Sequence, residues 1–437
     1  MQNYYKINNK DLSYFCSIMK WAYLLFIKLY PLIAWFISPF NRKAALWVSG
    51  RKNLLEKIRT AFSSNQDPVI WIHAASLGEF EQGLPIAEQL KKEYPGHRIL
   101  ITFFSPSGYE NKKNHPVADW VFYLPMDSAR NAKLLIEYTR PKLAIFIKYE
   151  FWYYYLKTLH NHNIPVLLVS GIFRPTQLFF KPFGGFYRSL LQYFRHLFLQ
   201  DQGSATLLKP YLAAVRMQVS GDTRFDRVIA IAAAAKSFPE IVQFADGLPL
   251  IIAGSTWSED DKVLHHFAIS HPEVKWIIAP HHIEEERLSE CLRFYPSAVL
   301  YSAFTKAKKE EQQETKTIVI DNIGILSQLY QYATIAFIGG GFTSQGIHNT
   351  IEAAVFGKPI IFGPVYDKYL EAIELIETGG AVSVENTLQL EQIFHILLQE
   401  KEKRYKMENA SLDYVKAKAG ATAQIISYIQ EKRLLIN

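Results

Sequence analysis

Short apolar runs alternate with polar or helical segments along most of the chain after residue 67. In the first half the runs are PVIWIHAAS, RILITFFS, VFYLP, KLAIFIKYE, IPVLLVSG and HLFLQ, with a helix expected from Gly83 to Glu93. This alternation is typical of a doubly wound parallel sheet with helices on both faces. Ligands of such sheets bind beyond the carboxyl ends of the strands, so polar residues that directly follow each run become candidate site residues.

The alternation pauses after Gly221–Asp226, passes through an alanine-rich helical stretch and then restarts. The later runs are LPLIIAGSTW, VKWIIAPHH, TIVIDN, TIAFIGGG and KPIIFGP. We therefore expect two Rossmann-like domains of an α/β protein with a cleft between them. The expected bounds are 46–226 for the first domain, 227–245 for a connector, and 246–437 for the second domain with a C-terminal helix.

A different pattern precedes these domains, because Trp21–Phe40 is almost continuously apolar. Its length is about that of a bilayer-spanning helix. Lys28 near the middle makes spanning costly, and the tryptophans and tyrosines of the segment favour the membrane interface. Spanning the bilayer, lying in its interface and packing as a core helix all remain open. Residues 1–45 are thus predicted to be a membrane-associated segment, with the body on the cytoplasmic side.

The distribution of charge supports a membrane and argues against nucleic acid. The net charge is +7, but residues 1–60 alone carry +8 and the rest of the chain −1. A nucleic-acid groove would spread its positive charge over the folded body, whereas a basic front beside apolar residues favours an anionic membrane surface. The two cysteines, Cys16 and Cys291, supply no disulfide framework, which favours a reducing compartment for the body.

The stretch Thr334–Gly363 contains three consecutive glycines after an apolar run, and then a short helix opened by Asn349. A glycine turn lets a backbone come close to a ligand, and N–H groups at a helix start attract phosphate. Asn349 and Glu352 also have the spacing of a capping box, which needs no ligand. The P-loop pattern is absent, and Ser344 replaces the last glycine of G-x-G-x-x-G, so a P-loop ATPase or an ordinary dehydrogenase is disfavoured.

Two carboxylates follow strands of the first domain. Gly78 suggests a tight turn that would set Glu79 at the mouth of the site, where it could act as a general base or simply complement a helix N-terminus. Glu150 ends the charged triplet after a later strand, before a run of aromatic residues that could hold a sugar or belong to the core. The loop Gly171–Gly185, rich in Phe with Arg174 and Lys181, suits an acidic, amphipathic acceptor.

Together these motifs resemble one family, the 3-deoxy-D-manno-octulosonic acid (Kdo) transferases of lipopolysaccharide assembly. The resemblance covers nearly the whole chain and rests on WIHAASLGE, YEFW, SGDTRFD, GST, APHH, DNIG and GGGFTSQGIHNTIEAA. It implies a glycosyltransferase of the GT-B type, with two Rossmann-like domains facing across a cleft.

The resemblance also implies roles for residues. Glu79 matches the family's proposed base, which deprotonates the acceptor hydroxyl. Glu150 falls in a second acidic motif, where Lys148 stands in place of an acid found in many relatives. Arg224 occupies a position usually held by lysine, and it keeps the positive charge.

On the donor side, the resemblance implies that the second domain holds CMP. His281 follows Pro280 where the family has arginine, which weakens a fixed phosphate contact. The other donor-binding residues implied are backbone groups that hold the base and groups that hold phosphate and ribose: Ile323, Gly324, Ile325, Gly340, Asn349, Thr350, Ile351 and Glu352.

The implied reaction is inverting transfer of Kdo from CMP-Kdo to the lipid A precursor, lipid IVA, at the cytoplasmic face of the inner membrane. CMP leaves with a single phosphate, so neither a metal ion nor another cofactor is expected, and no ligand cluster for a metal stands out in the sequence. Two alternatives stay open: a GT-B transferase or epimerase that uses a UDP-sugar, and a catalytically inactive nucleotide-binding scaffold at the membrane.

Overall fold

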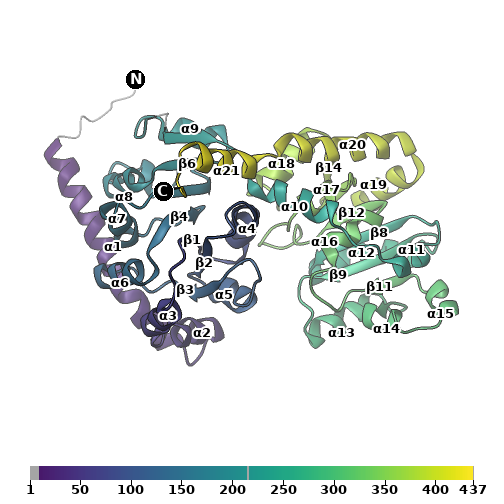
Figure 1. Cartoon of the computed structure of the whole chain (residues 1–437). Coiled ribbons are helices and arrows are strands. Elements are labelled where there is room, and N and C mark those ends of the chain that lie inside the picture. The colour runs from purple at the N-terminus through teal and green to yellow at the C-terminus, as the bar shows by residue number, and fades with distance from the viewer. Residues whose placement is uncertain (1–8, 214–215, 437) are drawn as a thin grey trace, which may run out of the picture. The chain divides into compact units, whose positions relative to one another are not determined.

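Two seven-stranded sheets, parallel in every pairing, organise the chain (Figure 1). The computed structural model describes residues 9–213 and 216–436. Contacts between residues divide the chain into two units, one formed by residues up to 227 together with 420–437, and the other by residues 228–419. This is the doubly wound α/β architecture that the alternation of runs predicts.

In the first unit the strand order is β3-β2-β1-β4-β5-β6-β7. All six apolar runs predicted as strands in this half are confirmed. The strands are β1 Val69–Ala74, β2 Arg98–Phe103, β3 Trp120–Tyr123, β4 Pro141–Ile147, β5 Val166–Gly171, β6 His196–Leu199 and β7 Met217–Val219.

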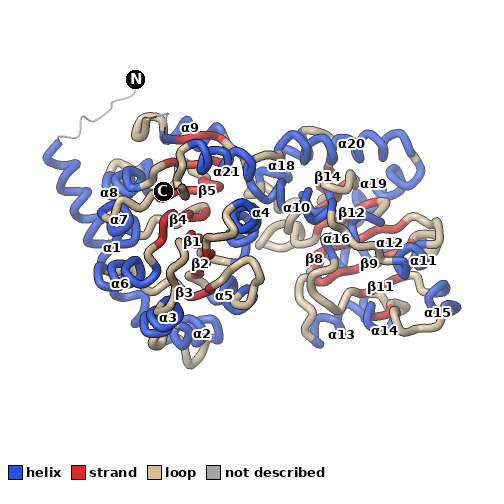
Figure 2. Tube along the Cα trace, viewed as in Figure 1, coloured by secondary structure: helices blue, strands red, loops and turns tan. Residues whose placement is uncertain are grey.

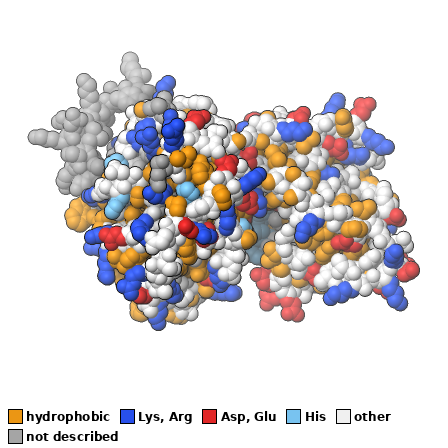
Figure 3. Space-filling model, in the orientation of Figure 1, with side chains coloured by type: hydrophobic (Ala, Val, Ile, Leu, Met, Phe, Trp, Pro, Cys, Tyr) orange, Lys and Arg blue, Asp and Glu red, His pale blue; other side chains and the backbone are white. Residues whose placement is uncertain are grey.

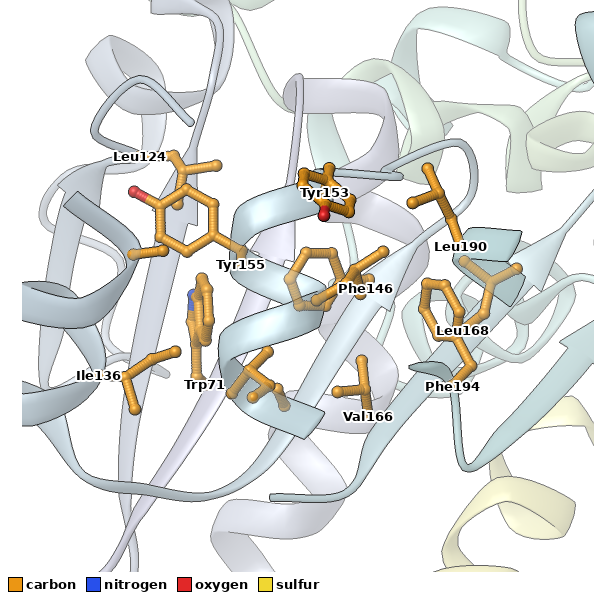
Figure 4. Close-up of a cluster of buried hydrophobic side chains, with 14 of the residues drawn as sticks. Trp71, Leu124, Ile136, Phe146, Tyr153, Tyr155, Val166, Leu168, Leu190 and Phe194 are labelled. Atoms are coloured by element: carbon orange, nitrogen blue, oxygen red, sulfur yellow. The ribbon is translucent and has the colours of Figure 1, made fainter. Parts of the chain in front are cut away.

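Helices cover both faces of this sheet (Figure 2). Because successive strand residues point to opposite faces, Trp71 packs under one helical layer and Ile72 under the other. Figure 4 shows the first layer, where Trp71 and Phe146 of the sheet lie against Tyr155 of the covering helix. The helices of this unit are α1 Asn9–Ile37, α2 Arg42–Gly50, α3 Leu54–Phe62, α4 Leu77–Glu93, α5 Pro106–Lys112, α6 Ala129–Thr139, α7 Tyr153–Asn161, α8 Gly185–Leu190, α9 Gln202–Leu208 and α21 Ala421–Glu431. Another helix, α10 Thr223–Ala233, begins in the first unit and ends in the second.

The second unit repeats the design with the order β10-β11-β9-β8-β12-β13-β14. Its strands are β8 Leu250–Thr256, β9 Lys275–Pro280, β10 Val299–Leu300, β11 Thr317–Val319, β12 Ile335–Ile338, β13 Ile360–Phe362 and β14 Ala381–Ser383. Its helices are α11 Pro239–Ala245, α12 Ser258–Ser270, α13 Glu285–Phe294, α14 Tyr301–Phe304, α15 Lys309–Glu314, α16 Leu326–Leu329, α17 Ile351–Ala354, α18 Leu370–Glu377, α19 Thr387–Gln399 and α20 Lys401–Lys418.

The apolar N-terminal segment is part of α1, which continues as a helix through Pro31. By length and composition, residues Ile18–Ile37 could cross a membrane. One side of the helix is not free, however, because Tyr23, Ile27 and Ala34 are buried. These three positions are four and seven residues apart, so they form one stripe that packs on the first unit.

The last helix differs in place from the sequence analysis, which extended the second domain to residue 437. In the structure, residues 420–437 belong to the first unit. Ile425, Ile426 and Ile429 of α21 join the core that also holds Leu84 of α4. Asp226 fixes the start of α21, since its carboxylate oxygens accept hydrogen bonds from the N–H groups of Gly420 and Thr422, both at 2.6 Å.

Candidate functional site

Glu79 lies in the first turn of α4, directly after β1. The expected tight turn at Gly78 is wrong, because α4 begins at Leu77 rather than Gly83 and Gly78 is helical. Glu79 Oε2 accepts hydrogen bonds from Ser76 N at 2.8 Å and from Ser76 Oγ at 3.1 Å. Burial, and then the nearby negative charge of Glu150, raise the pKa of Glu79 above the ordinary carboxyl value. A carboxylate with a raised pKa is a stronger proton acceptor, as a general base requires.

Glu150 follows β4 and is held by two side chains. Its Oε2 lies 2.9 Å from His73 Nε2 and 2.6 Å from Trp152 Nε1. His73 is fully buried, and its Nδ1 lies within hydrogen-bond distance of the carbonyl and hydroxyl oxygens of Thr102. Glu150 is therefore fixed in orientation, and its charge is directed at the same region as Glu79.

A cavity of about 590 Å³ opens beside Glu150. It connects the carboxylate with α1, since Tyr23 and Phe26 of that helix also line it. Aromatic side chains from both sides of Glu150 and residues 176–179 complete the wall. The loop Gly171–Gly185 is less exposed than the sequence suggests, because Phe179 packs in the hydrophobic core. The cavity has the mixed character, mostly apolar with one carboxylate, that an amphipathic acceptor needs.

Arg224 lies in the first turn of α10, two residues after Asp222. The carboxylate of Asp222 accepts hydrogen bonds from Arg224 N at 2.9 Å and from Arg224 Nε at 2.8 Å. Gln82 and Gln200 donate to the same carboxylate. The guanidinium of Arg224 is thus held by the buried carboxylate of Asp222. This contact limits the movement of the guanidinium and partly offsets its positive charge.

In the second unit, the glycine run after β12 is packed against other backbone segments. A Cβ on Gly341 would lie 2.5 Å from Gly363 N, and one on Gly340 would lie 2.4 Å from Gly346 O. The N–H of Gly340, a residue that the resemblance implies in donor binding, donates to Asp260 Oδ2 at 2.8 Å. Burial raises the pKa of Asp260 to about 6. These glycines thus serve the close approach of neighbouring loops.

Asn349 and Glu352 lie together at the start of α17. Asn349 Nδ2 donates to Glu352 Oε1 at 2.9 Å, and Asn349 Oδ1 accepts from Ile351 N at 3.3 Å. Asn349 therefore caps the helix, and it also orients the carboxylate of Glu352. Thr350 between them is buried, and its Oγ1 has no hydrogen-bond partner among the described residues.

His281 follows β9 and lies in a stack of rings. Its ring is 5.0 Å from the Trp257 ring and 4.2 Å from the His348 ring, nearly parallel to both. Trp257 Nε1 donates to His348 Nε2 at 3.0 Å. Burial lowers the pKa of His348 to about 4, and burial followed by the charge of His282 lowers the pKa of His281. His281 is thus neutral near pH 7 and cannot supply the permanent charge of an arginine.

The remaining predicted donor residues lie at strand ends of the same sheet. Pro280 closes β9, and residues 323–325 form a turn between β11 and α16. Ile323 is 83% exposed, and Gly324 has a φ of +99°, so the backbone of this turn is open to a ligand. Within the described part of the chain, no group of three or more His, Cys, Asp or Glu residues has the arrangement to hold a metal ion.

Sequence reasoning missed four site residues: His73, Trp152, Trp257 and Asp260. His73, Trp257 and Asp260 each contact a partner in another motif, whereas Trp152 contacts Glu150 of its own motif. His73 is the next-to-last residue of β1, and Asp260 lies in the first turn of α12, four residues after β8 ends. Both therefore lie near the carboxyl ends of strands, where ligands of such sheets bind.

Comparison with known proteins identifies relatives of the chain. A family model described as 3-deoxy-D-manno-octulosonic-acid transferase (kdotransferase) matches residues 52–227. A 3-deoxy-D-manno-octulosonic acid transferase from Aquifex aeolicus is 29% identical over 352 residues, which cover 78% of this chain and 89% of that protein. The enzyme of the same name from Haemophilus influenzae is 27% identical over 425 residues, covering 92% and 95%.

Among solved structures, the UDP-GlcNAc 2-epimerase from Neisseria meningitidis bound to UDP-GlcNAc has a similar fold. The TM-score is 0.59 at 16% identity, with 83% of this chain and 100% of that chain covered. At this identity the likeness concerns the fold alone, and it confirms the GT-B class of two Rossmann-like units.

Proposed function

We propose that the chain belongs to the family of 3-deoxy-D-manno-octulosonic acid (Kdo) transferases, to whose members it is similar, and that it transfers Kdo from CMP-Kdo to lipid IVA. The observation that carries the proposal is the pair of carboxylates, Glu79 and Glu150, which follow neighbouring strands in the region matched by the family model. Burial, and then the charge of Glu150, raise the pKa of Glu79, as suits a base that takes the proton of a hydroxyl.

In the proposed reaction, Glu79 takes the proton of the acceptor hydroxyl. The acceptor oxygen attacks the anomeric carbon of Kdo as the bond from that carbon to the phosphate oxygen breaks. CMP carries away the bonding electrons, and attack from the face opposite the phosphate inverts the configuration. Ser76 holds Glu79 through two hydrogen bonds to one oxygen, Oε2, which leaves Oε1 as the proton acceptor.

Glu150 has a supporting role in this scheme. His73 and Trp152 fix its carboxylate, and its negative charge favours the positive character that develops at the anomeric carbon as CMP leaves. It also keeps the pKa of Glu79 high. Arg224, restrained by Asp222, contributes positive potential for the leaving phosphate.

The donor is proposed to bind in the second unit. The exposed turn Ile323–Ile325 offers backbone groups to the cytosine, and Glu352, oriented by Asn349, offers an acceptor to the ribose hydroxyls. Pro280, His281, Thr350 and Ile351 surround the phosphate in this proposal, with Gly340 shaping the loop rather than donating its N–H. A monophosphate leaving group needs no bridging metal ion, so no cofactor is invoked.

We propose that α1 lies in the cytoplasmic interface of the inner membrane. The stripe of Tyr23, Ile27 and Ala34 packs on the first unit, and Tyr23 Oη donates to Asp127 Oδ2 at 2.5 Å. The opposite side carries Trp21 and Phe36, both about seven-tenths exposed. A helix attached along its length to a water-soluble body can bury its outer face in the interface but cannot also cross the bilayer. Figure 3 shows hydrophobic side chains at this edge of the first unit.

This orientation gives the acceptor a short path. The cavity beside Glu150 is lined by Tyr23 and Phe26 of α1, so a lipid acceptor would reach the carboxylates from the membrane without leaving it completely. The sugar part of the lipid would lie near Glu150 and the acyl chains along α1.

The test is a transfer assay with the full chain in detergent. CMP-Kdo and tetraacylated lipid IVA are supplied with and without EDTA, and the products are followed by mass spectrometry. Addition of one or more Kdo residues at the same rate in EDTA supports the proposal. Turnover of UDP-GlcNAc in place of CMP-Kdo would contradict it and favour a UDP-sugar enzyme, and nucleotide binding without any turnover would favour a scaffold.

A further inference from the structure

A second cavity of the first unit, about 740 Å³ in volume, lies at the edge of the sheet where strands begin. Val166, the first residue of β5, and Arg195, directly before β6, form one wall. The other wall is the end of α21 and the residues after it. Glu79 and Glu150 follow the opposite ends of the strands, so this cavity is separate from the candidate active site.

The cavity is strongly basic. Four cationic side chains line it, and among its described lining residues there is no Asp or Glu: the cations are Arg195, Arg216, Lys432 and Arg433. Figure 3 shows Lys and Arg side chains gathered on this face of the first unit, around the place where the chain ends in Figure 1. Like charges in one concavity repel each other, so the arrangement is unfavourable unless an anion offsets it.

Structural roles account for only part of this charge. Arg216 donates to Gln192 Oε1 and to the carbonyl of Gln192, both at 2.9 Å, and also to the carbonyl of Phe194. Lys432 and Arg433 follow the last turn of α21, where a cation complements the helix dipole. Arg195 is held by a side-chain hydrogen bond with Tyr428. The partners of Arg195 and Arg216 are uncharged, however, so both positive charges stay uncompensated.

A buried histidine beside the cavity is also affected by these positive charges. His196 is 5% exposed, and neither of its ring nitrogens has a hydrogen-bond partner among the described residues. Its ring lies 4.3 Å from the ring of Tyr428, which lines the cavity. Burial, and then the charges of Lys432, Arg195 and Arg216, lower the pKa of His196 to about 4. The charges of three cations thus all act on His196, which lies behind the cavity wall.

The position of the cavity points to the source of the anion. Tyr193, another lining residue, lies close enough to Lys20 of α1 and to Lys157 of α7 for both charges to act on its phenol. A run of cations therefore extends from the membrane-associated helix to the cavity. Its aromatic residues, Tyr193 and Tyr428, are of the kind found where proteins meet lipid headgroups.

We propose that this basic cavity binds a phosphate-bearing anion, and that its place beside α1 selects the headgroup of an anionic phospholipid. Occupation would fix the first unit on the membrane at a second point besides α1. Anion binding at this site is independent of the transfer reaction, whereas its lipid source rests on the proposed placement of α1 at the membrane.

The test uses the full chain in a neutral detergent and measures binding by calorimetry. The probes are inorganic pyrophosphate, short-chain phosphatidylglycerol and, as the zwitterionic control, short-chain phosphatidylcholine. The variant is Arg195→Gln/Lys432→Gln/Arg433→Gln, whose three side chains are exposed. The matched control, Lys401→Gln/Lys406→Gln/Lys416→Gln, removes the same charge from exposed positions of the second unit. Circular dichroism and Kdo transfer to a detergent-dispersed acceptor verify that both variants are folded.

We expect pyrophosphate and phosphatidylglycerol to bind the native chain and the control alike, and phosphatidylcholine to bind neither. The cavity variant should bind both anions at least tenfold more weakly, since each basic residue near an anionic headgroup contributes roughly a fivefold factor. If the cavity variant lost pyrophosphate binding but bound phosphatidylglycerol as tightly as the native chain does, the lipid source would be overturned. The ligand of the cavity would then be a soluble phosphate compound. Equal binding by the cavity variant and the control, or equal binding of the two lipids, would overturn the proposal.

Discussion

His73 Nε2 lies 2.9 Å from Glu150 Oε2, although 77 residues of sequence separate the two. β1 and β4 are neighbours in the sheet, and His73 pairs in register with Phe146 near the end of β4. The pairing brings His73, near the end of β1, next to Glu150, which follows β4. Thr102 of β2 then fixes the far side of the imidazole. Three adjacent strands thus determine the orientation of one carboxylate.

Replacing His73 should therefore impair the reaction through Glu150. His73→Gln is expected to lower kcat about ten- to hundredfold with little change in the KM for CMP-Kdo, because a hydrogen bond to a charged group is lost. Steady-state kinetics provide the measurement. His162→Gln, an exposed histidine of the same unit, is the control and should behave like the native chain. An equal loss in both variants would argue against a specific role for His73.

Removal of the base should abolish transfer but not donor binding. Glu79→Ala is expected to lower the transfer rate by about 10²–10⁴-fold, the usual contribution of a general base, and to leave the Kd for CMP unchanged. Glu81→Ala, two residues along the same helix, removes a carboxylate that pairs with Lys112 and should keep most of the activity. Activity of Glu79→Ala close to that of Glu81→Ala would exclude Glu79 as the base.

The pH dependence should reveal the coupling of the two carboxylates. A base works only when deprotonated, so kcat/KM should rise with pH through the pKa of Glu79, which burial and Glu150 hold above the ordinary carboxyl value. Glu150→Gln removes the second of these causes. The acid limb of its profile should therefore shift to lower pH, even though its maximal rate is lower. A limb that stays in place or moves upward would contradict the coupling.

Asp260 should make the second unit less stable as pH rises. Its pKa is about 6 in the folded chain and 3.8 in the unfolded one, so the folded state binds more protons between these values. The free energy of unfolding then falls as pH rises through this window. Asp260→Asn removes the titration and should be more stable than the native chain above pH 6, by on the order of 2–3 kcal/mol, with no such gain near pH 3. Urea unfolding at both pH values measures the difference, and Asp413→Asn, an exposed aspartate of the same unit, is the control.

His281→Arg should strengthen nucleotide binding at neutral pH. His281 is neutral there because its pKa is lowered, whereas arginine adds a permanent charge next to the proposed phosphate position. We expect the Kd for CMP to fall about tenfold at pH 7.5, in line with a charge-assisted hydrogen bond. The native chain should bind CMP more tightly as pH falls and His281 gains its proton, and the variant should lose this trend. A weaker Kd in the variant would show that stacking on Trp257 matters more than charge.

The sequence predicted the sheets well because their strands are buried on both faces and are therefore apolar throughout. Ile335–Ile338, for example, is β12 in full. Local cues near glycines were less reliable. Gly78 looked like a turn, but Ser76 and Glu79 cap a helix that begins before it, and the glycines near Gly340 face other backbone segments rather than a ligand.

Contacts across long stretches of sequence could not be predicted from periodicity. Asp260 and Gly340 are 80 residues apart, and nothing in either motif indicates that the carboxylate of one occupies the N–H of the other. The packing of α21 on the first unit is another long-range contact that periodicity could not predict. Its apolar stripe shows that the helix packs somewhere, but only Asp226 and the surface of α4 determine where.

That packing also sets the order in which the protein can mature on the ribosome. α1 emerges from the ribosome while the rest of the first unit is still being made. Ile425 and Ile429 belong to the core of that unit, yet they are translated after the whole second unit. The first unit can therefore complete its core only after the whole second unit has been translated and has had time to fold.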